Sequence, residues 1–268
     1  MVIRRTRTDI ESIDRYKKDI DDQGIKFPKI NRPEPVYYEF DKQLSELFDK
    51  TITCLVNKDE HGNKTGGLDY YRYRAIEFLK PEHQLKYGDV VSISGRLAAI
   101  MKTLLVKRLE SSFHAFKMSL KRFRKNTQHM IDMFANDKVY VAPDIDVNKY
   151  LDEDREDELE KLIEQKGGNN EIYLASDFQD GFIELLKEDK SKIDDLVEAW
   201  DTIDYDPKLD EFLERLGAFF LSKEVNHCGK LAIFSESRET VEYLQQHLDE
   251  NGFSKTLAIS AKNRKSKE

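Results

Sequence analysis

The chain has 268 residues and a formal net charge of -8, with 36% charged and 39% hydrophobic residues. No apolar run approaches the roughly 20 residues that cross a bilayer, and the first residues include arginines but no apolar signal core. We therefore expect a cytoplasmic protein of one or two domains, with reduced thiols at Cys54 and Cys228 and no membrane partner. The acidic average argues against a uniformly basic nucleic-acid binder, although positive and negative charges are strongly segregated along the chain.

The first part of the chain changes from polar to amphipathic near Asp41. Residues 1–34 are rich in charge, glycine and proline, and we expect them to form an extended connector. Residues 36–40 are apolar and aromatic, which predicts a strand. Asp41 is suited to cap a helix whose apolar residues recur at three-to-four spacing between residues 44 and 52.

The middle of the chain is predicted to be helical. Residues 68–79 have helical spacing, and one long helix is expected from Arg96 to Phe134, because neither proline nor glycine interrupts it. Residues 142–165 are strongly acidic and predict a solvated helix. Further helical patterns cover residues 178–187, 193–200 and 209–225, with starts at Asp177, Ser191 and Asp206 followed by Pro207; Trp200 in this region is expected to lie in the core.

The last forty residues predict a β-α-β unit, with strands at 230–234 and 256–259 and a helix at 238–251 that ends at Gly252. Ligands bind at the carboxyl ends of such strands, where Ser235, Glu236 and Ser237 lie. Their hydroxyl and backbone N–H groups could hold a phosphate at the helix N-terminus. The alternative is that a serine only caps the helix.

A basic stripe lies opposite an apolar face on the expected long helix. The apolar face has Leu105, Leu109, Phe113, Phe116, Leu120 and Phe123, and the stripe has Lys107, Lys117, Lys121 and Lys125, beside Arg108, Arg122 and Arg124. Such a stripe could contact the phosphate backbone of DNA, with affinity that falls steeply with salt. The alternative is an ordinary solvated face.

The sequence contains no assembled catalytic motif. Asp59-Glu60-His61 falls one residue short of the D-E-x-H box of helicases, and no G-x-x-x-x-G-K-[ST] phosphate loop precedes it. The six histidines and two cysteines show no metal-ligand spacing, so no structural metal is expected.

Three segments, in order, resemble the Swi/Snf-like ATPases of helicase superfamily two, in particular bacterial helicase-related proteins with a long insertion. Residues 2–10 (VIRRTRTDI) resemble the segment that joins the two lobes. Residues 104–120 (LLVKRLESSFHAFKMSL) resemble the K-R-L-E-S-S helix of the bacterial members. The segment from residue 206 to 213, followed by residues 230–237 (KLAIFSES), resembles a K-L-x-x-L helix followed by the strand of motif IV.

The resemblance implies a fold of the α/β class that is mostly helical: an incomplete RecA-like (P-loop NTPase-like) C-terminal helicase lobe with a large helical insertion. The implied parts are an interlobe linker at 1–34, the first strand and helix of the second lobe at 35–66, the helical insertion at 67–205, and the β-α-β portion with motif IV at 206–268. Arg4, Arg5 and Thr6 would couple the lobes.

The resemblance also implies a function. The intact protein would be an ATP-dependent translocase on double-stranded DNA that uses magnesium, and the first RecA-like lobe would be a partner of this segment. DNA contacts are expected at Ser235, Glu236, Ser237, Lys107, Arg108, Lys117, Lys121, Arg122 and Lys125. This segment lacks the phosphate loop, the magnesium carboxylates and the arginine-finger motif, so it is not expected to hydrolyse ATP or to hold a cofactor. The alternative is a helical protein-interaction module whose partner surface is the acidic segment at 144–165.

Overall fold

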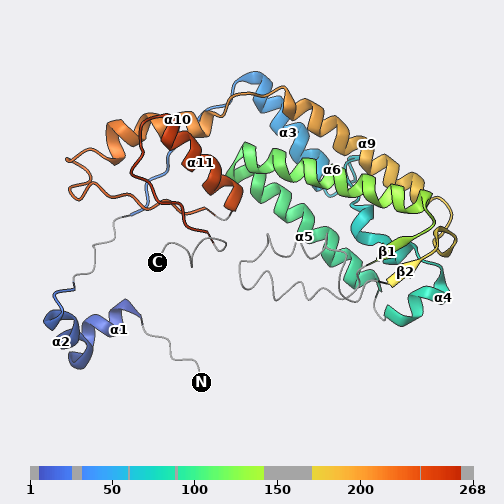
Figure 1. Ribbon diagram of the computed structural model, residues 1–268, viewed down its shortest axis with the longest axis horizontal. Helices are drawn as coiled ribbons and strands as arrows, with labels where there is room; N and C mark the ends of the chain where they lie inside the picture. Colours follow the sequence, from blue (N-terminus) through green and yellow to red (C-terminus); the bar gives the residue numbers. More distant parts are fainter. Residues whose placement is uncertain are drawn as a thin grey trace. The chain divides into compact units, whose positions relative to one another are not determined.

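The computed structural model describes residues 6–25, 32–59, 61–87, 90–141, 171–235 and 237–260. The chain divides into two units, Met1–Tyr37 and Tyr38–Glu268. Both are helical, and Figure 1 labels their elements. The expectation of a mostly helical chain is confirmed.

The first unit contains two short helices, α1 (Arg7–Ser12) and α2 (Asp14–Asp22), where the sequence predicted an extended connector. Helix α1 begins because Thr6 and Asp9 form a capping box, in which each residue accepts a hydrogen bond from the other's backbone N–H group. Local capping therefore supports α1, and neither of these two helices contributes a buried side chain.

In the second unit the main helices are α3 (Lys42–Val56), α5 (Val90–Ser111), α6 (Phe113–Ala135), α9 (Phe182–Asp201), α10 (Pro207–Arg215) and α11 (Arg238–Glu250). Shorter helical turns are η1 (Tyr71–Phe78), α4 (Pro81–Gln84), η2 (Leu85–Tyr87), η3 (Ala175–Asp177) and the π-helical turn η4 (Leu216–Phe220). Strands β1 (Val139–Val141) and β2 (Glu171–Tyr173) pair antiparallel, with Val139 opposite Tyr173. Within the described ranges this pair is the only sheet.

The prediction of one long helix from Arg96 to Phe134 is wrong, because the helix is interrupted at Ser112. This residue adopts an extended conformation, with φ -160° and ψ 129°, and its hydroxyl accepts a hydrogen bond of 3.3 Å from the backbone N–H of Ala115. A serine side chain competes in this way with the helical hydrogen bonds and favours an N-cap. Helix α6 thus starts anew and packs back against α5, forming the α5–α6 corner.

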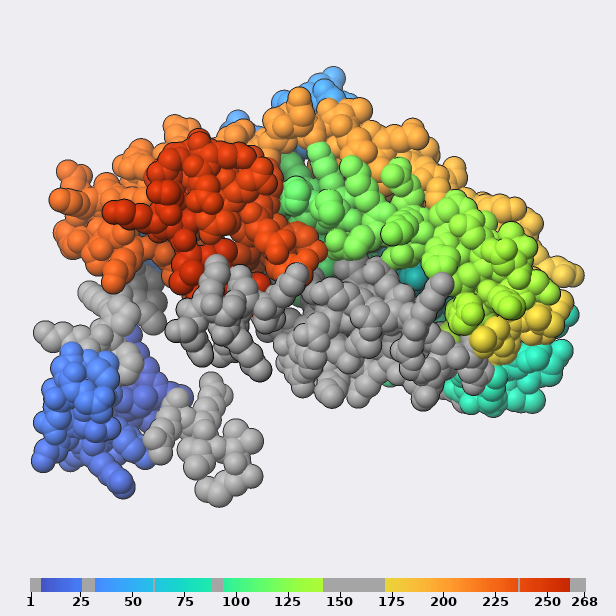
Figure 2. Space-filling model, viewed as in Figure 1, coloured from blue at the N-terminus to red at the C-terminus, as the bar shows by residue number. Residues whose placement is uncertain are grey.

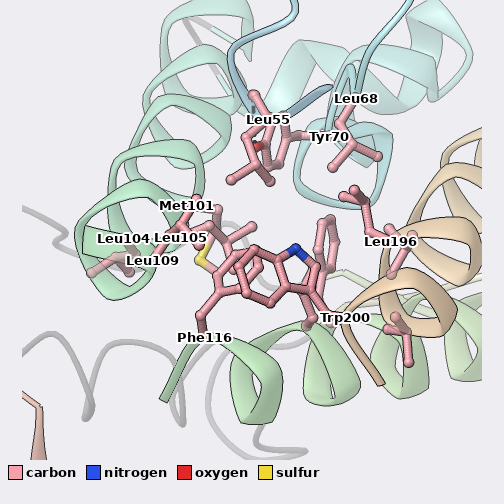
Figure 3. Close-up of a cluster of buried hydrophobic side chains, with 14 of the residues drawn as sticks. Leu55, Leu68, Tyr70, Met101, Leu104, Leu105, Leu109, Phe116, Leu196 and Trp200 are labelled. Carbon is pink, nitrogen blue, oxygen red and sulfur yellow. Dashed lines mark hydrogen bonds between the residues drawn. The ribbon is translucent and has the colours of Figure 1, made fainter. Parts of the chain in front are cut away.

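Four helices, α3, α5, α6 and α9, enclose the larger hydrophobic core (Figure 3). Trp200 lies fully buried at its centre, which confirms the prediction for this residue. The indole N–H donates to the Thr51 hydroxyl at 2.9 Å, and the indole ring meets Phe113 and Phe116 at centroid distances of 5.0 and 5.3 Å. A second core, which includes Phe178 and Phe182, lies where α6, α9 and β1 meet.

A buried carboxylate fixes the turn η1, which replaces the helix expected at residues 68–79 with a 3₁₀ helix. Asp189 of α9 is 1% exposed and accepts hydrogen bonds from the backbone N–H groups of Asp69 and Tyr71, at 3.1 and 2.9 Å. Burial raises the pKa of the Asp189 carboxyl, although these two N–H groups favour its charged form. The carboxylate therefore caps a helix that is distant in sequence.

Several predicted helix boundaries are confirmed. Asp41 caps α3 by accepting from the Leu44 N–H at 2.8 Å, and Asp206 caps α10, with Pro207 as its first residue. Helix α11 ends just before Gly252, which has a φ of +84°. The helix expected to start at Ser191 is instead part of α9, which is continuous.

The three predicted strands are wrong, since residues 36–40, 230–234 and 256–259 are assigned to no strand. Apolar runs of this kind predict strands buried by a sheet. Here Phe234 is 92% exposed and Leu257 is 65% exposed, so these side chains do not lie under a sheet face. The helix between the last two runs forms as expected, but the β-α-β unit does not.

The approach of residue 67 to α3 leaves no room for a side chain. A Cβ atom on Gly67 would lie 2.3 Å from the carbonyl oxygen of Cys54, which accepts a hydrogen bond from the Leu68 N–H at 2.9 Å. The Cys54 side chain is half-buried, whereas Cys228 is exposed.

We expect Gly67→Ala to lower the free energy of unfolding by roughly 1–3 kcal/mol, because the backbone of α3 has to move. Gly95→Ala is the matched control: it lies within α5 with nothing within 4 Å of its Cβ position. That substitution should raise the free energy of unfolding by up to about 1 kcal/mol. Urea denaturation measures both, and equal effects of the two variants would contradict the close approach.

Candidate nucleic-acid interface

The basic stripe and the serines before α11 meet at a polar network between α6 and α11. Arg122 of α6 donates to the Glu239 carboxylate of α11 at 3.2 Å. The other oxygen of that carboxylate accepts from the Ser237 hydroxyl at 3.0 Å. Arg122 and Ser237, which the sequence assigned separately to DNA contact, thus lie at one interface and are joined through Glu239.

Two further residues extend the network to α5. Arg108 is 6% exposed and donates to the Ser119 hydroxyl, to which Arg122 also donates at 3.1 Å. The Ser119 hydroxyl in turn donates to the Ala115 carbonyl at 2.9 Å. The α5–α6 corner makes this contact possible, because it lays the end of α5 beside α6.

The network holds Glu239 as a carboxylate. Burial alone would raise the pKa of this carboxyl, but its own backbone N–H, Arg122, Arg108 and the Ser237 hydroxyl all favour the charged form. The pKa therefore lies below its ordinary value of 4.5. A charged Glu239 interacts with two arginines at the N-terminus of α11, where the helix dipole also favours a negative charge.

An aromatic stack lies beside the network. The His114 ring of α6 stacks on the Tyr243 ring of α11 at 4.6 Å and 8°, and His247 meets the same tyrosine edge-on at 4.4 Å. The Tyr243 hydroxyl donates to the Asp206 carboxylate at 3.4 Å. Burial first, and then this carboxylate, raise the pKa of Tyr243.

Two lysines of the stripe are also engaged within the fold. Lys117 donates to the carbonyl of Ile203, and burial lowers its pKa. Lys121 pairs with Asp201 at 2.7 Å. Lys107 and Lys125 have exposed side chains. At least two lysines of the stripe therefore stabilise the fold through contacts with the segment at 201–203.

A surface hollow lies between the second half of α6 and the middle of α9. It is lined by Arg124, Lys125, Gln128, His129, Asp132, Lys190 and Asp194. Within it Lys190 pairs with Asp194 at 2.6 Å, and Gln128 donates to Asp132 at 2.8 Å. Figure 2 shows α6, in green, lying beside α9, in yellow to orange.

The serines at the predicted motif IV have structural contacts. Ser237 is the N-cap residue of α11 and is 4% exposed, but its hydroxyl bonds to Glu239 and makes no capping bond to the backbone. The Ser235 hydroxyl accepts from the Ser237 N–H at 3.3 Å. Of the remaining predicted residues, Thr6 caps α1. Arg4, Arg5, Glu236 and the acidic segment at 144–165 lie outside the described residues.

The Asp59 segment is a turn. Its carboxylate accepts from the backbone N–H groups of His61 and Asn63 at 2.9 and 2.8 Å, and Glu60 is outside the described ranges. Where the structure describes the chain, it groups no three His, Cys, Asp or Glu side chains in a way that could bind a metal. Over the same residues, no helix has both the length and the apolar character needed to cross a membrane.

Three residues that complete the interface could not be predicted from the sequence: Ser119, Glu239 and Tyr243. Each is an ordinary polar residue on a helix, and none belongs to a motif. The only available signal was position, since Glu239 lies two residues after Ser237 at the start of a predicted helix. Comparison of the chain with known proteins found no matching family model, no matching curated protein and no matching solved structure.

The stacked histidine makes stability depend on pH. Burial lowers the pKa of His114 below its ordinary value of 6.5, and Lys117 and His247 act in the same direction, while Glu239 and Asp206 oppose them. Between the lowered value and 6.5 the unfolded chain binds more protons than the folded chain. The free energy of unfolding contributed by His114 therefore rises with pH up to about 6.5 and then levels off.

We expect the free energy of unfolding of the wild type to rise relative to that of His114→Phe from about pH 5 to about pH 7, because phenylalanine keeps the stack without titrating. His129→Phe, at an exposed position on the same helix, is the control. Urea denaturation across this range measures the difference. A difference that is independent of pH, or one that is equal for the two variants, would be the contrary result.

Proposed function

We propose that this chain is part of the second motor lobe of a Swi/Snf-type, ATP-dependent DNA helicase or translocase, in which it binds the DNA backbone and couples the lobes. The observation that carries the proposal is that the basic helix and the serines before α11, assigned to DNA contact independently, meet at one interface through Arg122, Glu239 and Ser237. ATP and magnesium would be bound by other residues of the intact protein.

The contacts within the fold indicate which lysine and arginine side chains would bind DNA. Arg108, Lys117, Lys121 and Arg122 bond to groups of the fold itself, so they would mainly position the interface. Lys125 is exposed and lines the hollow with Arg124, whereas Lys190 on the other side of the hollow pairs with Asp194. Neighbouring cationic side chains of α6 can contact phosphates without reading the bases, which gives binding that depends on salt rather than on sequence.

The alternative function is a helical protein-interaction module without nucleic-acid contact. It is favoured by the exposed apolar side chains of the final segments, among them Phe234 at 92% and Leu257 at 65% exposure. Exposed apolar groups that lie together mark interaction sites more often than solvent faces. Absence of DNA binding at every salt concentration would favour this alternative.

We expect the double variant Arg124→Glu and Lys125→Glu to weaken binding to duplex DNA by roughly tenfold or more at low salt, and to reduce the slope of log affinity against log salt by about 2. The physical reason is the loss of two phosphate contacts. Fluorescence anisotropy with two unrelated duplex sequences, each titrated at several salt concentrations, measures the effect.

The matched control is the double variant Lys42→Glu and Lys50→Glu on α3. Both lysines are exposed, and the change in net charge is the same. This control should bind DNA as the wild type does, apart from a small general effect of charge. If both double variants bind equally well, the hollow makes no specific contribution. If the wild type itself does not bind, the DNA-binding proposal fails.

A further inference from the structure

Residues 206–260 attach to the rest of their unit without sharing its hydrophobic core. Among the described residues, both buried clusters are built from side chains no later than Ile203, with Tyr205 packed at the edge. The buried apolar side chains beyond that point are Leu209, Leu216 and Leu248. The hydrophobic effect that holds α3, α5, α6 and α9 together therefore does little to hold α11 on them.

Polar and aromatic contacts, rather than a shared apolar core, hold α10 and α11 on the other helices, and these contacts lie at the α5–α6 corner. Lys208 of α10 donates to the carbonyls of Glu110 and Ser111 at 2.9 and 3.0 Å, where α5 ends. The Tyr243 ring stacks on His114 in the first turn of α6. Figures 1 and 2 both show α11, in red, lying against the first part of α6, in green.

One contact between these helices joins opposite charges. The Arg122 and Glu239 side chains are 28% and 13% exposed, and their atoms approach to 3.2 Å. A carboxylate that is largely removed from water is costly when its partner is lost, so this pair should contribute more than an exposed one. Glu242, by contrast, is 62% exposed and pairs with Arg238 inside α11.

We propose that the Arg122–Glu239 ion pair is a releasable contact, which keeps residues 206–260 docked on the helical core and whose loss frees α11 while α3, α5, α6 and α9 stay folded. Interfaces that are polar and lack a shared core open at a lower free energy than the cores on either side. Because this ion pair is one of the contacts that hold the interface, salt and competing charges weaken the docking, although less than they would weaken an exposed pair, and the apolar core of the four helices depends little on them.

Hydrogen exchange of the full chain, without DNA, tests this proposal independently of the proposed function. We expect Glu239→Gln and Arg122→Gln each to accelerate amide exchange in residues 238–250 by roughly tenfold, as loss of a charged hydrogen bond implies. Exchange in α3 and α9 should remain at the wild-type rate. Added salt should accelerate exchange in α11 of the wild type and have little effect in Glu239→Gln.

Two controls match these variants in charge and place. Glu242→Gln removes the same charge from α11, and Arg124→Gln removes the same charge from α6, but neither residue joins the two helices. Both should leave exchange in α11 near the wild-type rate. Equal exchange in Arg122→Gln and Arg124→Gln would overturn the proposal. So would an acceleration that spreads equally to α3 and α9, since α11 would then open only when the whole unit unfolds.

Discussion

Burial of the Trp200 indole is the constraint on which the arrangement of the four main helices depends. Its N–H is shielded from water and needs an acceptor, and the Thr51 hydroxyl of α3 provides one at 2.9 Å. Its ring also contacts Phe113 and Phe116 of α6, and Figure 3 shows Phe116 beside it. The register of α3, α6 and α9 is thereby fixed at one point, and Phe113, the first residue of α6, places the α5–α6 corner beside it.

That corner decides what the basic residues can do. In one straight helix, Arg108 and Ser119 would lie about 16 Å apart along the axis, at 1.5 Å per residue. The break at Ser112 turns α6 back on α5, so the guanidinium group reaches the hydroxyl. The same turn presents His114 and Arg122 to α11. Basic residues that one long helix would have exposed to solvent therefore include Arg108 and Arg122, which form contacts between α5, α6 and α11.

The sequence predicted features that local chemistry determines. Asp41 and the Asp206–Pro207 pair mark helix starts because a carboxylate accepts from backbone N–H groups a few residues away. Trp200 could be assigned to the core because large aromatic side chains bury a large apolar area. The strand at 230–234 could not be judged in this way. The same apolar run suits a buried strand or an exposed segment, and only the presence of a sheet decides between them.

Contacts between distant segments were not accessible from the sequence for a related reason. The ion pair between Arg122 and Glu239 forms because the chain turns at Ser112, and that turn depends on how α5 and α6 pack. Asp189 likewise caps η1 across about 118 residues, and nothing in its neighbours identifies it as a cap. The candidate interface was therefore predicted in its basic and serine components, whereas the acidic and aromatic residues that join them were missed.

The different surroundings of the two cysteines have a practical consequence for following movement in this protein. Burial raises the pKa of the Cys54 thiol, so less of the reactive thiolate is present at neutral pH, whereas Cys228 is exposed. Alkylating reagents should therefore attach first to Cys228, which lies between α10 and α11. The native chain thus provides its own labelling position for a fluorophore or spin label on the segment whose docking depends on charge.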